Sequence, residues 1–521
     1  MTPCSHRQAR PARPADPAAS GNSAHPADPP APPASPSRGL WSPRVFLFSF
    51  LAFLCYTTGL SLLTPLHGSP DEPVHEIYGY QVVTGNIPLE SERVLAPRYL
   101  RSGAPDCWRT TRSQTAWCSP PLSSDATLRE MGTSAVNYPP LYYALTHQPL
   151  RFLSGAAALW AVRACSALLF SLLAAFGISA FAAGLPHRLE SFIALTVLTP
   201  AFFTFAGFSN PQSLEIGAAL AMAGCLIPLL RPLPPRETAR RWIAGGCAAL
   251  LLIMARPVGP YWAIAMCLLL AGVFGRERIR TYIRTRAFAL FMALCAAGCL
   301  AWLAWTRIST IYGPTPTEVT NDGWSALTLR LLGNFRYYMH ETIGTGGWRS
   351  VTTSVPVTVL YWVVLFAVVA AAWRWGQRRH RLSIALAFIS LPLSAVLMNT
   401  LVLSRTTFPI WQGRYGFPFL FPLFWVCVAV IATSGRRRTT VSGALARATS
   451  ALFFLATVDI TVRMAWRFYA GITTAPLWRV LTDTPPHALI GAALAIAVAG
   501  TYLVRTWRYT RRCADSPAPV I

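Results

Sequence analysis

The stretch RVFLFSFLAFLCYTTGLSLLT, residues 44–64, decides the fold class, and GSPDEPVHEIYGYQ, residues 68–81, follows it closely. The first stretch is an almost unbroken apolar run. As a helix it is long enough to cross the roughly 30 Å of hydrocarbon in a bilayer. Runs of this kind recur along the 521 residues. We therefore predict an all-α polytopic membrane protein that carries the acidic second stretch at a bilayer surface.

The composition of the whole chain agrees with this class. Hydrophobic residues make up 53% and charged residues only 12%, whereas a soluble domain carries about 25% charged residues. A net charge of +25 could suggest a nucleic-acid partner, but all 45 basic residues are arginines and many cluster between apolar runs. Such clusters are typical of cytoplasmic loops, so we expect a bilayer and no nucleic acid as the partner.

The apolar runs predict the topology. We expect twelve transmembrane helices with both termini in the cytoplasm, at residues 44–64, 157–183, 190–208, 213–230, 242–256, 258–274, 287–306, 356–373, 382–403, 415–433, 445–466 and 487–504. Region 242–274 is the least regular of these, because Arg256-Pro257 can turn it into a shallow hairpin. The prediction is therefore a bundle of about twelve helices.

The remaining segments are two tails and two long loops. Residues 1–43 are rich in Pro and Ala and are expected to be a disordered cytoplasmic tail. The transmembrane domain covers 44–505, and 506–521 is a second cytoplasmic tail. Loops 65–156 and 307–355 then face the extracytoplasmic side, where we expect the functional site.

Only two of the twelve cysteines, Cys107 and Cys118, fall in a predicted outer loop, within DCWRTTRSQTAWC. An oxidising exterior favours a disulfide between them. Two unpaired thiols are the alternative.

The acidic turn after the first apolar run is the main site candidate. Pro70 and Pro73 restrict the backbone around the adjacent carboxylates Asp71 and Glu72. Repulsion between the two carboxylates raises one pKa or recruits a cation. Together with His75, they suit a general base or a divalent metal such as Mg²⁺ or Mn²⁺. A solvated acidic loop is the alternative.

Further outer segments carry polar and aromatic side chains. NYPPLYYAL, residues 137–145, contains Tyr138 and is followed by His147, and an interfacial aromatic belt is the alternative for this segment. WQGRYGFPFLFP, residues 411–422, contains Arg414. This outer guanidinium needs an anionic partner, such as a lipid phosphate or, alternatively, an acidic side chain.

The second outer loop and the ends of the apolar runs add weaker candidates. Trp348 and Arg349 lie among glycines in 307–355, in a segment that is either a lid over a sugar or an ordinary connector. Asn210 and Arg256 lie at span ends, where polar groups usually face the protein interior or a cavity.

The motifs SPDEPVHEIYGYQ, NYPPLYY and QGRYGFP together resemble a bacterial family of predicted membrane proteins of unknown function, grouped with the GT-C glycosyltransferases. The resemblance covers roughly residues 44–505. The acidic turn and the Pro-Pro-Leu segment also resemble protein O-mannosyltransferases and lipid A aminoarabinose transferases. Those enzymes take sugars from polyprenyl phosphates at the outer face and use an acid of the first outer loop as base. The resemblance implies a GT-C-like bundle.

Carried over by position, the resemblance makes Asp71 the base, with Glu72 and His75 matching its neighbours. Arg414 and Tyr415 match the family's Gly-Arg-Tyr element. Gln212 stands where a second acid would be expected. The full set of candidates is catalytic Asp71 and Glu72; donor phosphate-binding Arg414, Tyr415, Arg256 and Arg349; substrate-binding His75, Tyr138, His147, Asn210, Trp348 and Gln412; and metal-binding Asp71, Glu72 and His75.

These assignments predict an integral-membrane glycosyltransferase. It would move a sugar, with inversion, from a polyprenyl-phosphate donor to an extracytoplasmic glycan or protein, with Asp71 as base. No cofactor is required by this chemistry, and Mg²⁺ or Mn²⁺ stays open. The alternatives are a transporter or flippase of a lipid-linked glycan and a non-catalytic partner in envelope assembly.

Overall fold

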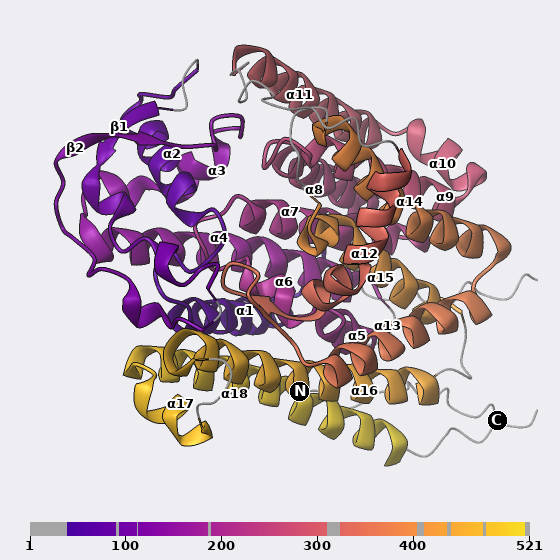
Figure 1. Cartoon of the computed structure of the whole chain (residues 1–521). Helices are drawn as coiled ribbons and strands as arrows, with labels where there is room; N and C mark the ends of the chain where they lie inside the picture. Colours follow the sequence, from indigo (N-terminus) through magenta and orange to yellow (C-terminus); the bar gives the residue numbers. More distant parts are fainter. Residues whose placement is uncertain are drawn as a thin grey trace, which may run out of the picture.

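The computed structural model describes residues 39–515, apart from 90–92, 112, 186–188, 310–323, 404–410, 435–438 and 472–475. Most of the predicted N-terminal tail lies outside these residues. The chain forms an all-α membrane bundle (Figure 1). Nine helices of the described part are long and apolar enough to cross a bilayer, or ten if one bent pair is counted. They are α1 (Pro43–Leu63), α4 (Gly155–Gly184), α7 (Gln212–Leu226), α11 (Arg286–Ile308), α13 (Val355–Trp375), α14 (Arg378–Leu403), α15 (Phe417–Ala432), α16 (Thr439–Ala465) and α18 (Pro486–Asp515).

The described part of the structure has fewer candidate spans than the roughly twelve predicted, and the first difference lies at 190–208. This run forms two short buried helices, α5 (Leu189–Thr196) and α6 (Pro200–Thr204). Pro200 ends the first helix because proline cannot donate the backbone hydrogen bond that would continue it. Neither helix is long enough to cross the hydrocarbon layer.

The second difference lies at 242–274. Helix α8 (Pro235–Ile253) begins earlier than predicted and carries Glu237 and Arg241 near its start. Helix α9 (Gly259–Phe274) turns by 116° into α10 (Arg276–Ile283), and this is the bent pair. The apolar runs are therefore present, but they are shorter than full spans.

Close backbone contacts hold the bundle together. Helix α1 packs antiparallel to α18, with Phe48 against Tyr502 at a ring distance of 5.7 Å. In the α4–α7 pair, a Cβ on Gly224 would lie 1.9 Å from the carbonyl oxygen of Gly177. Small residues at such crossings let helices approach closely, a common packing mode in membranes.

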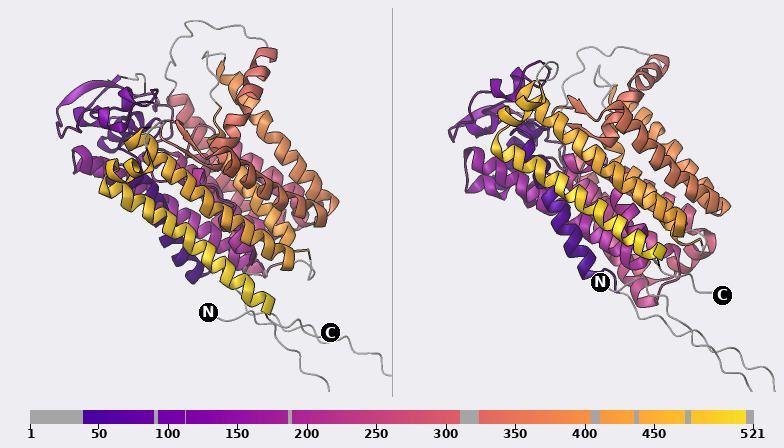
Figure 2. Two further views of the ribbon diagram at one scale, coloured as in Figure 1. Left: turned by 60° about the horizontal axis from the view of Figure 1, so that its bottom comes forward. Right: turned by 90° about the horizontal axis from the view of Figure 1, so that it is seen from below.

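The two ends of the bundle differ in character. The start of α1 and the end of α18 lie together, and Arg241 donates to the carbonyls of Leu40 and Ala180 at this end. Segment 65–156 lies at the opposite end (Figure 2). This grouping agrees with the predicted loops, while the sidedness of the membrane stays a prediction. Helix α18 continues to Asp515, through most of the predicted C-terminal tail.

The first outer loop is an ordered cap. It contains α2 (Glu72–Thr84), α3 (Leu141–Thr146) and the antiparallel strands β1 (Arg93–Pro97) and β2 (Leu128–Gly132). The structure joins Cys107 to Cys118 in a disulfide. The adjacent carbonyls accept hydrogen bonds from buried Arg467, in the π-helical turn Trp466–Ala470 after α16.

The second outer loop and the C-terminal region complete the cap. Helix α12 (Trp324–Ile343) and the short hairpin β3 (Thr345–Gly346) and β4 (Val351–Thr352) occupy the described part of 307–355. Trp348 in this hairpin donates to the carbonyl of His67 at 2.9 Å, so the two outer loops touch. Helix α17 (Leu477–Asp483) lies before α18.

Candidate functional site

Asp71 lies at a strained turn that the first outer loop makes directly before α2. Its backbone is left-handed, with φ of 66°, a conformation that Asp tolerates better than most residues. The side chain is 49% exposed, and Oδ2 lies 3.3 Å from Nη2 of Arg414. The structure thus brings together the predicted base and the predicted phosphate-binding cation.

Glu72, the other predicted catalytic acid, faces the opposite way into the protein. Its two oxygens accept hydrogen bonds from Nε and Nη2 of Arg163, both at 2.7 Å, and both side chains are buried. The backbone N–H groups of Ser69 and Ser209 also point at this carboxylate. Since both oxygens have partners, Glu72 anchors the turn and does not face Arg414.

Arg163 extends this anchor to the end of α1. It also donates to the carbonyls of Ser61, Thr64 and Pro65. One guanidinium therefore fixes the last turn of the first span, the link that follows it and Glu72. The position of Asp71 depends on this network.

The turn Gly413–Gly416 before α15 presents Arg414 from the other side. Glu341 of α12 accepts the backbone N–H of Gly413 at 2.8 Å and also pairs with Arg349. A Cβ on Gly413 would lie 2.8 Å from the carbonyl oxygen of Tyr338, so a glycine is needed at this close approach. The role of Arg349 is therefore to hold Glu341, which in turn holds the Arg414 turn.

The Arg414 guanidinium is buried but only partly paired. The residue is 3% exposed, and among the described residues its Nε and Nη1 have no hydrogen-bond partner. Its Cζ lies 4.5 Å from the ring centroid of Phe205. Buried donors without partners are costly. This arrangement favours an anion that completes the hydrogen bonds.

A second buried arginine stands beside the first. Arg256, in the link between α8 and α9, pairs with Glu215 of α7 at 3.0 Å, and its Nε has no partner in the described part of the chain. The Tyr415 ring centroid lies 5.0 Å from Cζ of Arg256 and 5.5 Å from Cζ of Arg414. The ring of Tyr415 therefore lies near both cations.

His75 and Tyr138 add neutral polar groups near these charges. The Nδ1 atom of His75 is 2.7 Å from the Tyr143 hydroxyl, and its ring meets Tyr138 edge-on at 5.2 Å. Burial, with the charges of Arg256 and Arg414, holds the pKa of His75 well below its usual value. Burial also raises the pKa of Tyr138. At neutral pH both side chains are uncharged hydrogen-bonding groups.

Three residues that were predicted to bind substrate instead make contacts between the segments around the site. His147 contacts Thr146 at Nδ1 and Ser209 at Nε2, at 2.8 and 2.9 Å, so both ring nitrogens have partners. Asn210 Oδ1 accepts the N–H of Gln212 at the start of α7. Trp348 joins the two outer loops, as described above. These side chains hold neighbouring segments together.

Gln412 and Gln212 lie beside the Arg414 turn. Gln212 donates through Nε2 to the carbonyl of Arg414 at 2.8 Å. The Oε1 atoms of both glutamines are buried without a partner among the described residues. The amide at 212, where sequence reasoning expected an acid, therefore supports the backbone of the predicted phosphate site.

The predicted metal ligands do not form a metal site. Glu72 is held by Arg163, and Nδ1 of His75 is taken by Tyr143, which leaves Asp71 without them. No group of three His, Cys, Asp or Glu side chains in the described ranges is arranged to hold a metal ion. Side chains that are neighbours in the acidic stretch of sequence therefore have different partners in the folded protein.

Four residues that build the site have no assigned role in the sequence-based prediction: Arg163, Glu215, Glu341 and Tyr143. Their partners could not be read from the sequence, because most of them lie far away along the chain. Glu215 had a signal, because a carboxylate inside an apolar run usually faces the protein interior.

Comparison with known proteins adds one result. The family model described as "Predicted membrane protein (DUF2142)" matches residues 54–424, which include the acidic turn, both buried arginines and the Arg414 turn. No curated protein matches the chain. Because the model covers more than half of the sequence, the chain belongs to the DUF2142 family of predicted membrane proteins.

Proposed function

We propose that this chain is an integral-membrane glycosyltransferase that takes its sugar from a polyprenyl phosphate. One observation carries the proposal: the half-exposed Asp71 carboxylate lies 3.3 Å from the buried guanidinium of Arg414, two nitrogens of which have no hydrogen-bond partner among the described residues. A carboxylate beside an unsatisfied cation suits a reaction that both removes a proton and releases an anion.

The proposed step is a single displacement at the anomeric carbon. Asp71 takes the proton of an acceptor hydroxyl, and the acceptor oxygen bonds to the anomeric carbon. The bond from that carbon to the phosphate oxygen breaks with inversion, and the phosphate leaves as an anion. A glycosidase needs a second carboxyl group as acid because its leaving group is an alcohol. A phosphate needs none, which fits a site where Glu72 is occupied by Arg163.

The departing phosphate would be stabilised by Arg414 and Arg256, which both lie near the Tyr415 ring. Fixed donors in a buried site stabilise developing charge strongly, because they need no reorganisation. Tyr138 and neutral His75 would contact the sugar. The acceptor would be an extracytoplasmic glycan or protein, since segment 65–156 and the acidic turn lie at one end of the bundle (Figure 2).

One observation favours the alternative of a lipid-linked glycan transporter. The predicted third span is broken into α5 and α6, and broken helices are common in transporters. Their binding sites, however, lie near the middle of the membrane. Here the two partly paired arginines, Arg256 and Arg414, lie where α7 and α15 begin and α8 ends.

The test compares Asp71→Asn and Arg414→Gln with a control, Asp125→Asn, in a strain that lacks the native copy. Asp125 is another acid of the first outer loop, and it pairs with exposed Arg98. The readouts are the envelope glycans, the pool of polyprenyl-phosphate sugars and the amount of folded protein by size-exclusion chromatography.

Loss of a general base lowers a rate about 10²- to 10⁴-fold. We therefore expect the Asp71 variant to lose the glycan product and accumulate the lipid-linked sugar, while the Asp125 variant behaves as wild type. Normal product from folded Asp71→Asn protein would refute the enzyme. Retained anomeric configuration, seen by NMR of the product, would refute the single displacement.

A further inference from the structure

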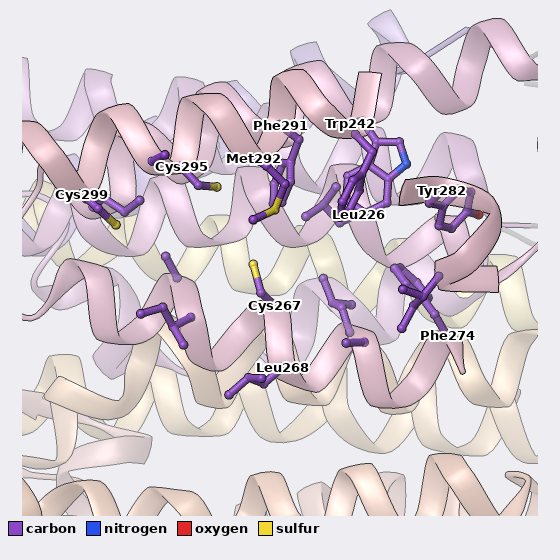
Figure 3. Close-up of a pocket in the computed structure, with 18 residues that line it drawn as sticks. Leu226, Trp242, Cys267, Leu268, Phe274, Tyr282, Phe291, Met292, Cys295 and Cys299 are labelled. Atoms are coloured by element: carbon purple, nitrogen blue, oxygen red, sulfur yellow. The ribbon is translucent and has the colours of Figure 1, made fainter. Parts of the chain in front are cut away.

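An apolar cavity of about 440 Å³ lies between α8, α9, α10 and α11. Its lining is formed by hydrocarbon, aromatic and thiol side chains. Figure 3 shows Cys295, Cys299 and Met292 on one wall and Cys267 on the facing wall, with Cys267 and Met292 pointing toward each other. None of the described residues that line the cavity is charged, so the cavity suits an apolar ligand.

The cavity opens to the surroundings of the bundle. Leu268 is 68% exposed, and Ile264 and Met292 are also exposed although they line it. In a membrane protein these side chains face lipid. A hydrocarbon chain can therefore enter from the side without crossing water.

One end of the cavity lies close to the arginine site. Ile253, the last residue of α8, and Ala263 in α9 both line it. The link between them carries Arg256. On the other wall, Trp305 follows Cys299 along α11 and packs against the apolar cluster that contains Tyr143. The cavity thus leads away from the predicted phosphate site along α9, toward Phe274 at the end of that helix and Tyr282 in α10.

We propose that this cavity holds the isoprenoid chain of the lipid phosphate whose head group binds Arg414 and Arg256. The inference rests on the proposed function and names where the donor's tail lies. A water-sized group takes about 30 Å³, so the cavity has room for about 15 such groups of one chain. We assign one chain to it because the proposed donor, a polyprenyl phosphate, carries a single hydrocarbon chain, whereas a phospholipid carries two.

The test fills the cavity and leaves its surroundings unchanged. Cys299→Trp places a large ring inside, and the matched control Leu300→Trp places the same ring on the adjacent residue, which is 66% exposed and does not line the cavity. Ala271→Phe fills the cavity from the opposite wall. Binding of radiolabelled decaprenyl phosphate and of inorganic phosphate is measured on purified full-length protein, with thermal unfolding as the check on folding.

We expect Cys299→Trp and Ala271→Phe to weaken decaprenyl phosphate at least fivefold, with inorganic phosphate unchanged. Leu300→Trp should bind both as wild type does. Arg414→Gln should weaken both ligands, because it acts on the phosphate.

The outcomes separate this inference from the proposed function. Equal decaprenyl phosphate affinity in folded Cys299→Trp and Leu300→Trp protein overturns the tail site, even if Arg414→Gln weakens binding. No effect of Arg414→Gln, with a clear effect of Cys299→Trp, overturns the phosphate site and supports the tail site. Mass spectrometry of co-purified lipid identifies the occupant, and loss of a two-chain phospholipid in Cys299→Trp overturns the isoprenoid assignment.

Discussion

Replacing Glu72 with Gln tests whether this acid is an anchor, as its contacts indicate. The substitution keeps the shape of the side chain but removes the charge that Arg163 faces at 2.7 Å. Arg163 is 1% exposed, so its charge would stay in a buried site without compensation. Breaking a buried ion pair in this way costs about 3–5 kcal/mol of the free energy of unfolding.

The matched control is Glu130→Gln in the same outer loop. Glu130 pairs with Arg93 at 3.5 Å, but the two side chains are 60% and 77% exposed. Water screens such a pair, and its loss costs at most about 1 kcal/mol. Both variants are unfolded in mixed micelles with a rising fraction of SDS, and tryptophan fluorescence reports the unfolding.

A double-mutant cycle completes the experiment. In Glu72→Gln with Arg163→Gln, two neutral amides replace the ion pair, so part of the loss should be recovered. The coupling energy should be about 2 kcal/mol or more, because the two side chains touch. A Glu72→Gln variant as stable as wild type, or a coupling energy near zero, would refute the reasoning. A stable but inactive Glu72→Gln protein would instead support the catalytic role that the sequence suggested.

Three further predictions concern the stability of the segments around the site. Burial lowers the pKa of His147 from 6.5 to about 3, so the unfolded chain binds the proton first and stability falls as the pH drops below 6.5. Between pH 7.5 and 5.5 this loss of free energy of unfolding is about 1.4 kcal/mol. The His147→Gln variant should lack it when unfolding is measured across this pH range. An unchanged slope of unfolding free energy against pH would show that His147 is not its source. Replacing Cys107 and Cys118 by Ser opens a loop with a sequence separation of 11. This change should lower the free energy of unfolding by about 3 kcal/mol. Equal stability of the oxidised wild-type and mutant proteins in SDS titration would contradict a stabilising role of the disulfide. Glu341→Gln weakens the contacts with Arg349 and Gly413 and should lower the free energy of unfolding by about 2 kcal/mol. The variant should also bind decaprenyl phosphate more weakly. Wild-type affinity for decaprenyl phosphate would show that Glu341 does not position Arg414.

The class of the protein could be predicted from the sequence alone, because an apolar run long enough for a bilayer is a local property. Nine of the twelve predicted spans correspond to candidate spans in the described part of the structure. The other three do not form single long apolar helices in the described structure, although α9 with α10 counts as a bent candidate. Pro200 interrupts the run at 190–208, and charges near the start of α8 and the sharp bend after α9 shorten the other two.

The candidate site was likewise only partly predictable from the sequence. The sequence brought attention to Asp71 and Arg414, because an acid between prolines and a cation outside the arginine-rich loops are visible in the printed residues. The chemistry of the two residues could not distinguish Asp71 from Glu72, since adjacent carboxylates are equivalent along the chain, and only the resemblance to known families singled out Asp71 as the base. The left-handed backbone at Asp71 sends one carboxylate toward Arg414 and leaves the other to Arg163.

The sequence alone thus determined that this chain is a membrane protein. It also determined the approximate position of most helices and the residue types that can carry charge at their ends. Tertiary structure alone decided which charges meet. Arg163, Glu215 and Glu341 come from separate helices, and each finds a partner at least eight residues away along the chain. Pairing of this kind depends on how helices pack and on which buried groups still lack a partner, and neither is written in any local stretch of sequence.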